Sequence, residues 1–266
     1  MLVTPTHCQG GITRQTARMD LTLAGRVYLV TGGTRGLGRA TASCLVEEGA
    51  RVVVSGRDAA SVEQTVSALG DQHCAGVVAD NADPATAERL VRAALDRFGR
   101  LDGALISVGG PPPGPALAAT DEQWRTAFES VFLGAVRVAR AAVPALTDGG
   151  ALAFVLSTST RSPIAGLAIS NGLRPGLAML AKTMADELGP RGVRVLGLLP
   201  GRLATDRTLS LDADEQARRG NENAIPLRRY GDPAEFGRVA TFVLSPAASY
   251  LTGCMIPVDG GALRTI

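Results

Sequence analysis

Short apolar runs alternate along the chain with longer segments in which apolar residues recur every three or four positions. The runs predict strands, because an uninterrupted apolar run fits a parallel strand that is buried on both faces. The periodic segments predict helices with one buried face. Seven strands are expected, at residues 27–30, 51–55, 75–79, 101–107, 151–157, 193–199 and 250–258. The helices with the clearest periodicity are expected at residues 84–98, 121–144, 170–188 and 233–244, after a first helix that ends near residue 49.

This alternation predicts the fold class. A chain that repeats strand and helix from end to end forms an α/β fold, with helices on both faces of a mostly parallel sheet. We therefore expect a single-domain, Rossmann-like, doubly wound parallel sheet of about seven strands, whose ligand lies beyond the carboxyl ends of the strands. The length of 266 residues and the apolar content of 45% suffice to bury one such core.

Two segments stand apart from the alternation. Residues 1–20 show no periodicity and are expected to form a disordered tail, so that residues 21–266 make up the single dinucleotide-binding domain. Cys8 lies beside His7 in this tail, but a metal site would need two further ligands, and none is expected. Residues 202–230 are polar, rich in arginine and without strand character, and we expect them to form a lid over the site.

The charge balance points away from polyanionic partners. The 27 basic and 25 acidic residues give a net charge of +2 and are interspersed, so no basic face for nucleic acid or an anionic membrane is predicted. The chain lacks an apolar run of about 18 residues that would span a membrane, and it lacks the apolar core of a secretory signal. Its four cysteines form no closely spaced pair, which fits a reducing compartment. We expect a cytoplasmic protein whose partners are a small-molecule substrate and further copies of itself.

A glycine-rich turn follows the first strand and carries the first chemical signal. Its glycines let the backbone pass close to a diphosphate and aim the N–H groups of the next helix at it. The spacing is one residue longer than the G-x-G-x-x-G fingerprint of dinucleotide sites, and a turn that only packs a helix on a strand would also use glycines. We expect the nucleotide to contact this turn at Thr31, Gly32, Thr34, Arg35, Gly36, Leu37 and Gly38.

The end of the second strand indicates which cofactor is bound. An NAD-selective site places a carboxylate there, whereas an arginine accommodates the 2'-phosphate of NADP. This chain has Ser55 and Arg57, with Arg35 of the glycine-rich turn as a second clamp, so NADP(H) is favoured over NAD(H). If both arginines are instead solvated and Asp58 only caps the next helix, the choice stays open. Three further positions are expected to line the nucleotide: Asp80 and Asn81 after the third strand and Gly109 after the fourth.

The helix expected at residues 121–144 is apolar on more than one side. Trp124, Phe128 and Phe132 lie on it together with valines and alanines, so it needs cover beyond the sheet. Either a second subunit covers the additional face, or that face is ordinary core. We favour the subunit contact.

The motifs, taken in chain order, resemble the classical short-chain dehydrogenase/reductase family over about residues 21–263. The resemblance rests on the glycine-rich turn, on Asp80 after the third strand, on Pro200-Gly201 after the sixth, and on Tyr250-Leu251-Thr252-Gly253 with Val258-Asp259-Gly260-Gly261 at the end. The last set is typical of the family's 3-oxoacyl-reductase-like branch. The resemblance implies a bound NAD or NADP with Pro200 and Gly201 beside it, hydride transfer, and a homodimer or homotetramer built through the long helices and the last strand.

At the catalytic positions the chain departs from the family pattern. The family's Asn-Asn-Ala-Gly after the fourth strand is replaced by Ser-Val-Gly-Gly at residues 107–110, and its helix asparagine falls at Val131. The resemblance aligns the family's serine with Ser157, its tyrosine with Ser170, and its lysine with Arg174. Of the four usual catalytic positions, only Ser157 keeps the family's residue.

The three aligned residues favour electrostatic stabilisation over acid–base chemistry. A tyrosine has a pKa of about 10 that a neighbouring lysine can lower, whereas a serine hydroxyl is a far weaker acid and a guanidinium does not shuttle protons. Ser157, Ser170 and Arg174 can instead stabilise a developing alkoxide by hydrogen bonding, with water or the substrate supplying the proton. Arg174 is also expected to bind the cofactor, because its guanidinium can hold ribose hydroxyls. Carbonyl, quinone or enone substrates whose product anion is already stabilised need the missing acid least.

The sequence therefore supports an NADP-dependent oxidoreductase with an atypical active site. The alternative is an NADP(H)-binding protein without redox activity, a sensor or an assembly partner, in which Ser170 caps a helix and Arg174 pairs with a surface carboxylate. An isomerisation or a dehydration on the same scaffold is a third hypothesis. Asn171, Arg161 and Tyr230 are candidate substrate contacts under the first hypothesis.

Overall fold

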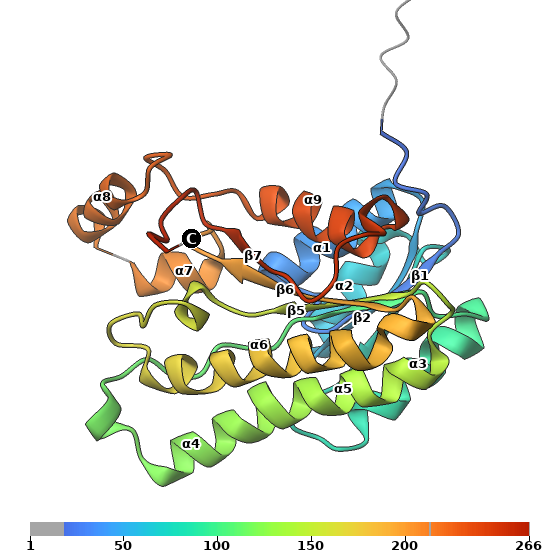
Figure 1. Ribbon diagram of the computed structural model, residues 1–266, viewed down its shortest axis with the longest axis horizontal. Coiled ribbons are helices and arrows are strands. Elements are labelled where there is room, and N and C mark those ends of the chain that lie inside the picture. The colour runs from blue at the N-terminus through green and yellow to red at the C-terminus, as the bar shows by residue number, and fades with distance from the viewer. Residues whose placement is uncertain (1–18, 213, 266) are drawn as a thin grey trace, which may run out of the picture.

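Seven parallel strands form the centre of the fold, in the order β3-β2-β1-β4-β5-β6-β7 (Figure 1). The computed structural model describes residues 19–212 and 214–265. Its strands are β1 (Val27–Val30), β2 (Arg51–Gly56), β3 (Cys74–Val78), β4 (Gly103–Ile106), β5 (Ala151–Val155), β6 (Arg194–Pro200) and β7 (Met255–Val258). The doubly wound parallel sheet expected from the sequence is thereby confirmed. The tail of residues 1–18, expected to be disordered, lies outside the described residues.

The last strand is shorter than its apolar run predicts. It begins at Met255 rather than at residue 250. Gly253, with a φ of +67°, turns the chain just before it. A turn in this left-handed region of φ ends an extended strand, and glycine adopts it without steric cost. The sixth strand instead runs one residue further than expected and includes Pro200.

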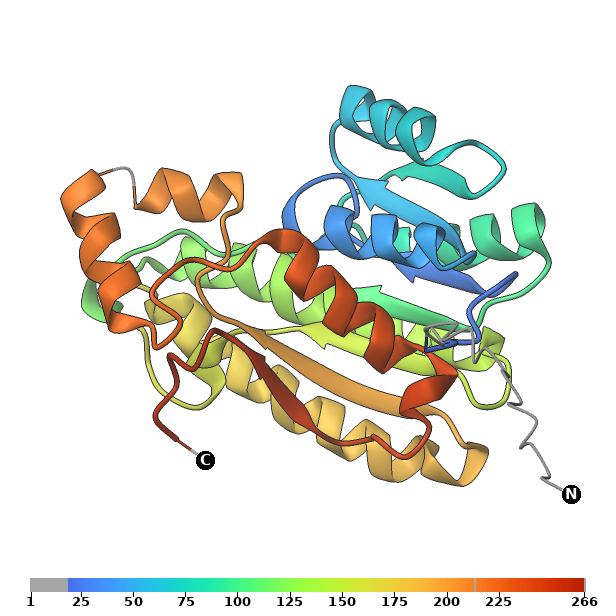
Figure 2. The ribbon, with the colours of Figure 1, turned by 90° about the horizontal axis from the view of Figure 1, so that it is seen from above.

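Helices cover both faces of the sheet, which explains why its strands are continuous apolar runs. Alternate residues of a strand point to opposite faces. Leu29 of β1 therefore packs into one core cluster, under α3, α5 and α6, while Tyr28 and Val30 pack into the other, under α1, α2 and α9 (Figure 2). These helices are α1 (Gly36–Glu47), α2 (Ala59–Leu69), α3 (Thr86–Phe98), α5 (Gly134–Ala142), α6 (Ala168–Leu188) and α9 (Pro233–Leu244).

The long helix expected at residues 121–144 is continuous and contains a π-helical turn between two α-helical parts. It consists of α4 (Asp121–Ala127), a π-helical turn (Phe128–Leu133) and α5. Trp124 and Phe132 pack against Gly172 and Gly176 of α6, where an added Cβ atom would lie 2.7 and 2.9 Å from their rings. This part of the apolar surface is therefore core of the same chain. Phe128 remains 42% exposed, so the contact with a second subunit stays a prediction.

Two short helices form the segment expected to be a lid. They are α7 (Asp206–Leu211) and α8 (Glu215–Ala224), and they lie beyond the carboxyl end of β6 (Figures 1 and 2). Thr205 and Asp214 cap them by accepting hydrogen bonds from the N–H groups of residues 208 and 217. At the base of the lid, Asp212 forms an ion pair with Arg202 and accepts a hydrogen bond of 2.8 Å from the Tyr230 hydroxyl.

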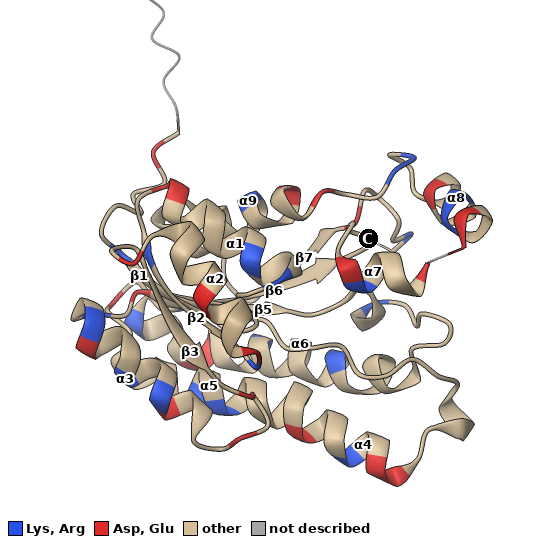
Figure 3. Ribbon diagram, turned by 180° about the vertical axis from the view of Figure 1, so that it is seen from behind, with Lys and Arg blue, Asp and Glu red and all other residues tan. Residues whose placement is uncertain are grey.

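Charged residues of both signs alternate on the outer helices α3, α4 and α8 (Figure 3). Some pair within one helix, as Arg125 does with Asp121 and Arg219 with Glu215. Among the residues that the structure describes, no helix is long and apolar enough to cross a membrane.

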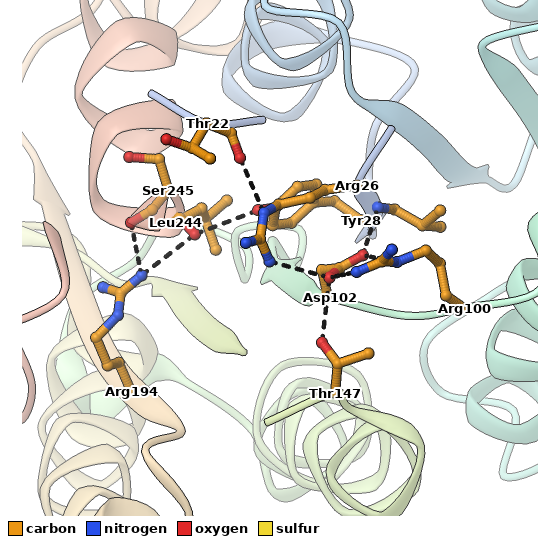
Figure 4. Close-up of polar contacts among 10 residues, drawn as sticks. Thr22, Arg26, Tyr28, Arg100, Asp102, Thr147, Arg194, Leu244 and Ser245 are labelled. Atoms are coloured by element: carbon orange, nitrogen blue, oxygen red, sulfur yellow. Dashed lines mark hydrogen bonds and ion pairs between the residues drawn. The ribbon is translucent and has the colours of Figure 1, made fainter. Parts of the chain in front are cut away.

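A buried carboxylate, that of Asp102, connects the amino ends of the central strands β1 and β4 (Figure 4). These strand ends lie at the end of the sheet away from the residues expected to form the lid. Asp102 accepts five hydrogen bonds: one from the Val27 N–H group, two from Arg100, and one each from Arg26 and Thr147. Burial raises the pKa of Asp102, but these hydrogen bonds, with that from Arg100 the strongest, together hold the pKa below its ordinary value. The ionised carboxylate is therefore the form that the fold stabilises.

A second buried charge, Arg194, holds the carboxyl end of α9 against the same end of the sheet (Figure 4). Its guanidinium donates hydrogen bonds of 2.6 to 3.5 Å to four backbone carbonyls, those of Val243, Leu244, Ser245 and Leu251. Unpaired carbonyls at the carboxyl end of a helix carry partial negative charge, which compensates the guanidinium. Arg194 thus has a structural role.

Candidate active site

The order of the strands reverses between β1 and β4, so the loops that follow these two strands run in opposite directions from a shared starting point. Ligands of doubly wound sheets bind at such a point, beyond the carboxyl ends of the strands. Thr31 joins the two loops, because its hydroxyl donates to the Ser107 carbonyl and accepts from the Ser107 N–H group, both at 2.8 Å. Thr31 is fully buried and therefore shapes the site from inside the fold.

The glycine-rich turn after β1 leaves the amino end of α1 open. Gly36 begins the helix with a φ of +52°, and no side chain caps the first turn, whose N–H groups have no partner within a helix. Gly38 packs so closely beneath the turn that an added Cβ atom would overlap the Gly32 carbonyl oxygen. An uncapped amino end reached by a close-packed turn is suited to a diphosphate.

Alanine at position 38 is therefore expected to weaken NADPH binding by about 10- to 100-fold, as overpacking of about 1–3 kcal/mol displaces the turn. Titration of the protein with NADPH, followed by the fluorescence of the nicotinamide, measures the change. The matched control is Gly220→Ala in α8, where an added Cβ atom meets nothing within 4 Å. Unchanged NADPH affinity in Gly38→Ala would rule out this turn as the diphosphate site.

Two arginines flank the end of β2, where the cofactor's adenosine ribose is expected. Ser55 is buried, and its carbonyl accepts a hydrogen bond of 2.9 Å from the N–H group of Gly33. Arg57 is exposed. Arg35 donates to the Ser61 hydroxyl at 2.9 Å and lies 3.8 Å from Asp58. Asp58 caps α2, as expected for the case in which it has only a structural role. The side chains of Arg35 and Arg57 nevertheless remain exposed beside the end of β2.

Other expected cofactor positions serve packing as well. Thr34 lies against Gly56 at the end of β2, and the Leu37 side chain joins the core cluster under α1 and α9. Asp80 is exposed and accepts a hydrogen bond of 3.0 Å from the N–H group of residue 82. The Asn81 backbone lies against Gly134 of α5. Their contacts with a nucleotide stay predictions.

Ser157, Ser170 and Arg174 lie on two adjacent elements. Ser157 follows β5 and begins a single turn of 3-10 helix by accepting a hydrogen bond of 3.1 Å from the Ser159 N–H group. Ser170 and Arg174 lie one turn apart on α6, which packs against this 3-10 turn, and each is only 6% exposed. Ser170 is inside the helix, which begins at Ala168, so the expectation that it might cap the helix is wrong.

The Arg174 guanidinium reaches from α6 to the carboxyl ends of the central strands. It donates hydrogen bonds to the Val155 carbonyl at 2.5 Å and to the Gly109 carbonyl at 3.5 Å. The alternative hypothesis expected Arg174 to pair with a carboxylate on the surface, and its burial shows that this expectation is wrong. Burial, with a smaller contribution from the charge of Arg207, lowers the pKa of Arg174 to about 10, so the guanidinium is still charged at neutral pH.

Two hydroxyl groups of the 3-10 turn that packs against α6 lack partners. Among the described residues, the hydroxyls of Ser159 and Thr160 are buried without a hydrogen bond. Buried polar groups without partners cost stability and are rare, which favours their use by a ligand or by water. Sequence reasoning missed Ser159 and Thr160, although they belong to the same Ser-Thr-Ser-Thr run as Ser157.

Comparison with known proteins identifies the scaffold. A profile of the family described as enoyl-(acyl carrier protein) reductase matches residues 32–262. An uncharacterized oxidoreductase of Mycobacterium tuberculosis is 34% identical over 89% of this chain and 91% of its own length. The chain belongs to the short-chain dehydrogenase/reductase family. L-rhamnose 1-dehydrogenase (NAD(P)(+)) of Azotobacter vinelandii is 33% identical over 90% of this chain and 97% of its own length.

The fold of this short-chain dehydrogenase/reductase also matches solved structures over nearly its whole length. The L-sorbose reductase of Gluconobacter frateurii, crystallised with NADPH and L-sorbose, superposes with a TM-score of 0.88 at 28% identity. The match covers 93% of this chain and all of that protein. The sequence-based resemblance to the family is thereby confirmed.

Two residues of the lid reach the site of this short-chain dehydrogenase/reductase, and sequence reasoning missed both. Thr205 lies opposite the glycine-rich turn, 3.4 Å from the Cβ position of Gly36. Arg207 lies over Gly110 and donates a hydrogen bond of 2.8 Å to the Pro111 carbonyl. The available signal was that both follow shortly after Pro200-Gly201, the motif that ends β6.

Three residues considered as substrate contacts make contacts within the fold. Asn171 bonds both the N–H group and the carbonyl of Ile164, at 3.1 and 2.8 Å, and so shapes the loop before α6. Arg161 donates to the Met255 carbonyl at 3.0 Å, and Tyr230 bonds to Asp212 at the base of the lid. These contacts explain the three residues structurally, and a role in substrate binding stays a prediction.

The backbone geometry also explains two motifs that the family shares. Gly201 is held against Asp259, because a Cβ atom at Gly201 would lie 2.6 Å from the Asp259 Cβ atom. The motif after β6 therefore fits the motif after β7. Val131, at which the sequence resemblance predicts the family's asparagine, is 2% exposed inside the π-helical turn and offers no polar group.

Proposed function

We propose that this protein is an NADP(H)-dependent reductase that transfers a hydride to a carbonyl, quinone or enone substrate in an atypical active site. The observation that carries the proposal is the placement of Arg174. Its charged guanidinium is buried at the carboxyl end of β5, where it donates to the carbonyl of Val155, two residues before Ser157. It also donates to the carbonyl of Gly109 in the loop after β4. The cation and the nearby hydroxyls form a polar group at the switch point of a dinucleotide-binding sheet.

The chain's own residues would stabilise charge rather than deliver a proton. When bound, the reduced nicotinamide supplies the hydride, which adds to the carbonyl carbon. The electron pair of the C=O double bond moves to the oxygen, where Arg174 and the hydroxyls of Ser157 and Ser170 donate hydrogen bonds to the developing oxyanion. Water then protonates the oxyanion and is left as hydroxide, because a serine hydroxyl is too weak an acid and a guanidinium does not shuttle protons.

The magnitudes make this route workable but slow. Loss of a positioned general acid costs about 10²- to 10⁴-fold in rate. One preorganised donor to an oxyanion recovers about 10²- to 10³-fold. Substrates whose product anion is delocalised, such as quinones, enones and diketones, need the least help and are the expected substrate class.

NADPH consumption against a panel of quinones, enones, diketones and 3-oxoacyl thioesters tests the proposal. Turnover of at least one of these compounds is the expected result. Tight NADPH binding without turnover of any of them would contradict it and favour the second candidate, an NADP(H)-binding protein without redox activity. The absence of a tyrosine at position 170 is the observation that keeps this candidate in view.

The preference for NADP(H) is part of the proposal and has its own test. Arg57→Ala and Arg35→Ala are each expected to weaken NADPH binding by about tenfold or more, since a hydrogen bond to a charged group contributes about 1.5–3 kcal/mol. Affinity for NADH, which lacks the 2'-phosphate, is expected to stay unchanged and serves as the internal control. Equal losses for both cofactors would contradict the assignment of these arginines to the 2'-phosphate.

Support for NADP(H) also comes from relatives. The similar L-sorbose reductase was crystallised with NADPH, and the similar L-rhamnose dehydrogenase is named for NAD(P)(+). We further propose assembly as a homodimer or homotetramer, supported by the exposed apolar side chains of Phe128 and Met179 on the helical face formed by the π-helical turn and α6. A cytoplasmic location stays a prediction.

A further inference from the structure

Two guanidinium groups meet on the loop that follows β4. From α6, Arg174 donates to the Gly109 carbonyl at 3.5 Å. From the lid, Arg207 donates to the Pro111 carbonyl at 2.8 Å. Between these two carbonyls lies Gly110, where an added Cβ atom would be 2.5 Å from the centre of the Arg207 guanidinium. Residues 33 positions apart in sequence thus bring two positive charges to one short stretch of backbone.

Within residues 19–212 and 214–265, no carboxylate forms an ion pair with Arg174 or Arg207. The ion pairs found among the described residues involve other arginines. The repulsion between the two cations is one of the causes that lower the pKa of Arg174. Arg174 is buried, whereas Arg207 is exposed. A buried charge without a partner is costly, so proteins pair such a charge or use it to bind an ion.

Arg194 shows how this chain satisfies a buried guanidinium that is purely structural. It donates to four carbonyls, three at the carboxyl end of α9 and that of Leu251 in the segment before β7. Arg174, equally deep, makes only two hydrogen bonds, one of them at 3.5 Å. A guanidinium has five N–H donors, so Arg174 keeps donors for a ligand.

The negative charges of the cofactor have other positions in this fold. The diphosphate belongs at the uncapped amino end of α1, and the 2'-phosphate belongs beside Arg35 and Arg57 at the end of β2. Arg174 and Arg207 lie on the β4 loop instead. Neither cation is therefore needed to neutralise a phosphate of NADP(H), although Arg174 is also expected to donate to a ribose hydroxyl of the cofactor.

We propose that the substrate carries a carboxylate, which Arg207 of the lid binds together with Arg174 beside the reacting carbonyl. A guanidinium matches the planar carboxylate with two parallel hydrogen bonds, and a low-dielectric site strengthens them. The substrate class is then an oxo acid. This inference rests on the proposed reductase function for the reaction, but the carboxylate site itself does not depend on turnover.

The test compares acids with their neutral esters in the presence of NADPH. Acetoacetate is paired with ethyl acetoacetate, and phenylglyoxylate with its methyl ester. Malonate, which carries carboxylates and cannot be reduced, serves as a binding probe on the complex with NADPH. Trp124, the only tryptophan of the chain, lies against Gly172 of α6, the helix that carries Arg174, and supplies the fluorescence signal.

Arg207→Gln is the decisive variant, and Arg218→Gln in α8 of the same lid is its matched control. We expect malonate to bind, and the acid of at least one pair to be reduced with a kcat/KM at least about tenfold above that of its ester. Arg207→Gln is expected to weaken malonate binding and acid reduction by about 10- to 100-fold with unchanged NADPH affinity. Arg218→Gln is expected to change neither.

Two results would overturn the carboxylate site. One is a preference for the esters, with no binding of malonate. The other is an equal loss of NADPH affinity in Arg207→Gln, which would assign Arg207 to the cofactor diphosphate. If no carbonyl compound is reduced while malonate still binds through Arg207, the reductase proposal fails and the site stands. If neutral carbonyls are reduced without any effect of Arg207→Gln, the reductase stands and the site fails.

Discussion

Replacing Arg174 with methionine is expected to lower kcat/KM for reduction by about 10²- to 10³-fold, the loss that follows removal of one preorganised donor to an oxyanion. The protein should remain folded. Burial lowers the pKa of Arg174, which means that the fold disfavours its charged form. An apolar side chain of similar length removes this cost but leaves the Val155 carbonyl without the guanidinium, so the melting temperature is expected to change little.

Two comparisons separate the role of the charge from that of the packing. Arg174→Lys keeps a cation at the position and is expected to retain about tenfold more activity than Arg174→Met, although a lysine cannot form the same two hydrogen bonds. Arg194→Met removes the other deeply buried guanidinium, far from the site. It is expected to lower the melting temperature, because it leaves carbonyls of α9 unpaired, while the turnover of the folded enzyme is unchanged.

Steady-state kinetics with the best substrate of the panel, together with thermal unfolding, measure these effects. A loss in kcat with little change in KM would place Arg174 in the stabilisation of the transition state. A rise in KM alone would reduce its role to binding. Wild-type kcat/KM in Arg174→Met would contradict the proposed mechanism.

The fold was predictable because its signals are local. Each strand is a continuous apolar run, and the first is followed at once by the glycine-rich turn, so the order of elements alone defines a doubly wound sheet. The helices of the lid escaped prediction although their caps are visible in the sequence. Thr205 and Asp214 each stand three residues before the N–H group that they cap. The segment was judged by its polarity, and polarity alone does not distinguish an exposed helix from a loop.

In the candidate site, only the residues that lie close together in the sequence could be predicted, because their spacing is visible there. The offsets from Ser157 to Ser170 and Arg174 depend on one segment, and the structure places that segment against the end of β5. What could not be predicted are contacts between distant segments. Arg207 reaches Pro111, which is 96 residues away, and no local pattern encodes this pairing.

Asp102, at the amino end of β4, also has contacts that could not be predicted because its partners are distant in sequence. In the sequence it is one polar residue inside the strand predicted at residues 101–107. In the structure it binds Arg26 and Thr147, which are 76 and 45 residues away. Because these partners come from separate elements, the carboxylate fixes how β1, β4 and the segment before β5 meet. A residue with this role is expected to matter for stability rather than for catalysis.

Asp102→Ala is expected to lower the free energy of unfolding by about 3–5 kcal/mol, the usual cost of removing one partner from a buried ion pair. The side chain is completely buried, and its loss leaves the Val27 N–H group and the Thr147 hydroxyl without an acceptor. For a domain of this size the melting temperature should fall by about 2–4 °C per kcal/mol. Urea unfolding at neutral pH measures the change. Arg100→Gln is the control: its guanidinium is 46% exposed, so water replaces much of what is lost and the effect should be about 1 kcal/mol or less.

The effect of Asp102 should also depend on pH in a defined direction. Its pKa in the folded protein lies below the ordinary value, which is about 4 in an unfolded chain. The ionised carboxylate therefore contributes its full stabilisation above about pH 4, and this contribution disappears as the pH falls through the folded-state pKa. The difference in stability between the wild type and Asp102→Asn, which cannot ionise, is expected to be constant from pH 7 to about pH 4 and to shrink below it. A difference that stays constant into stronger acid would show that the shape of the side chain, and not its charge, holds the amino ends of the strands together.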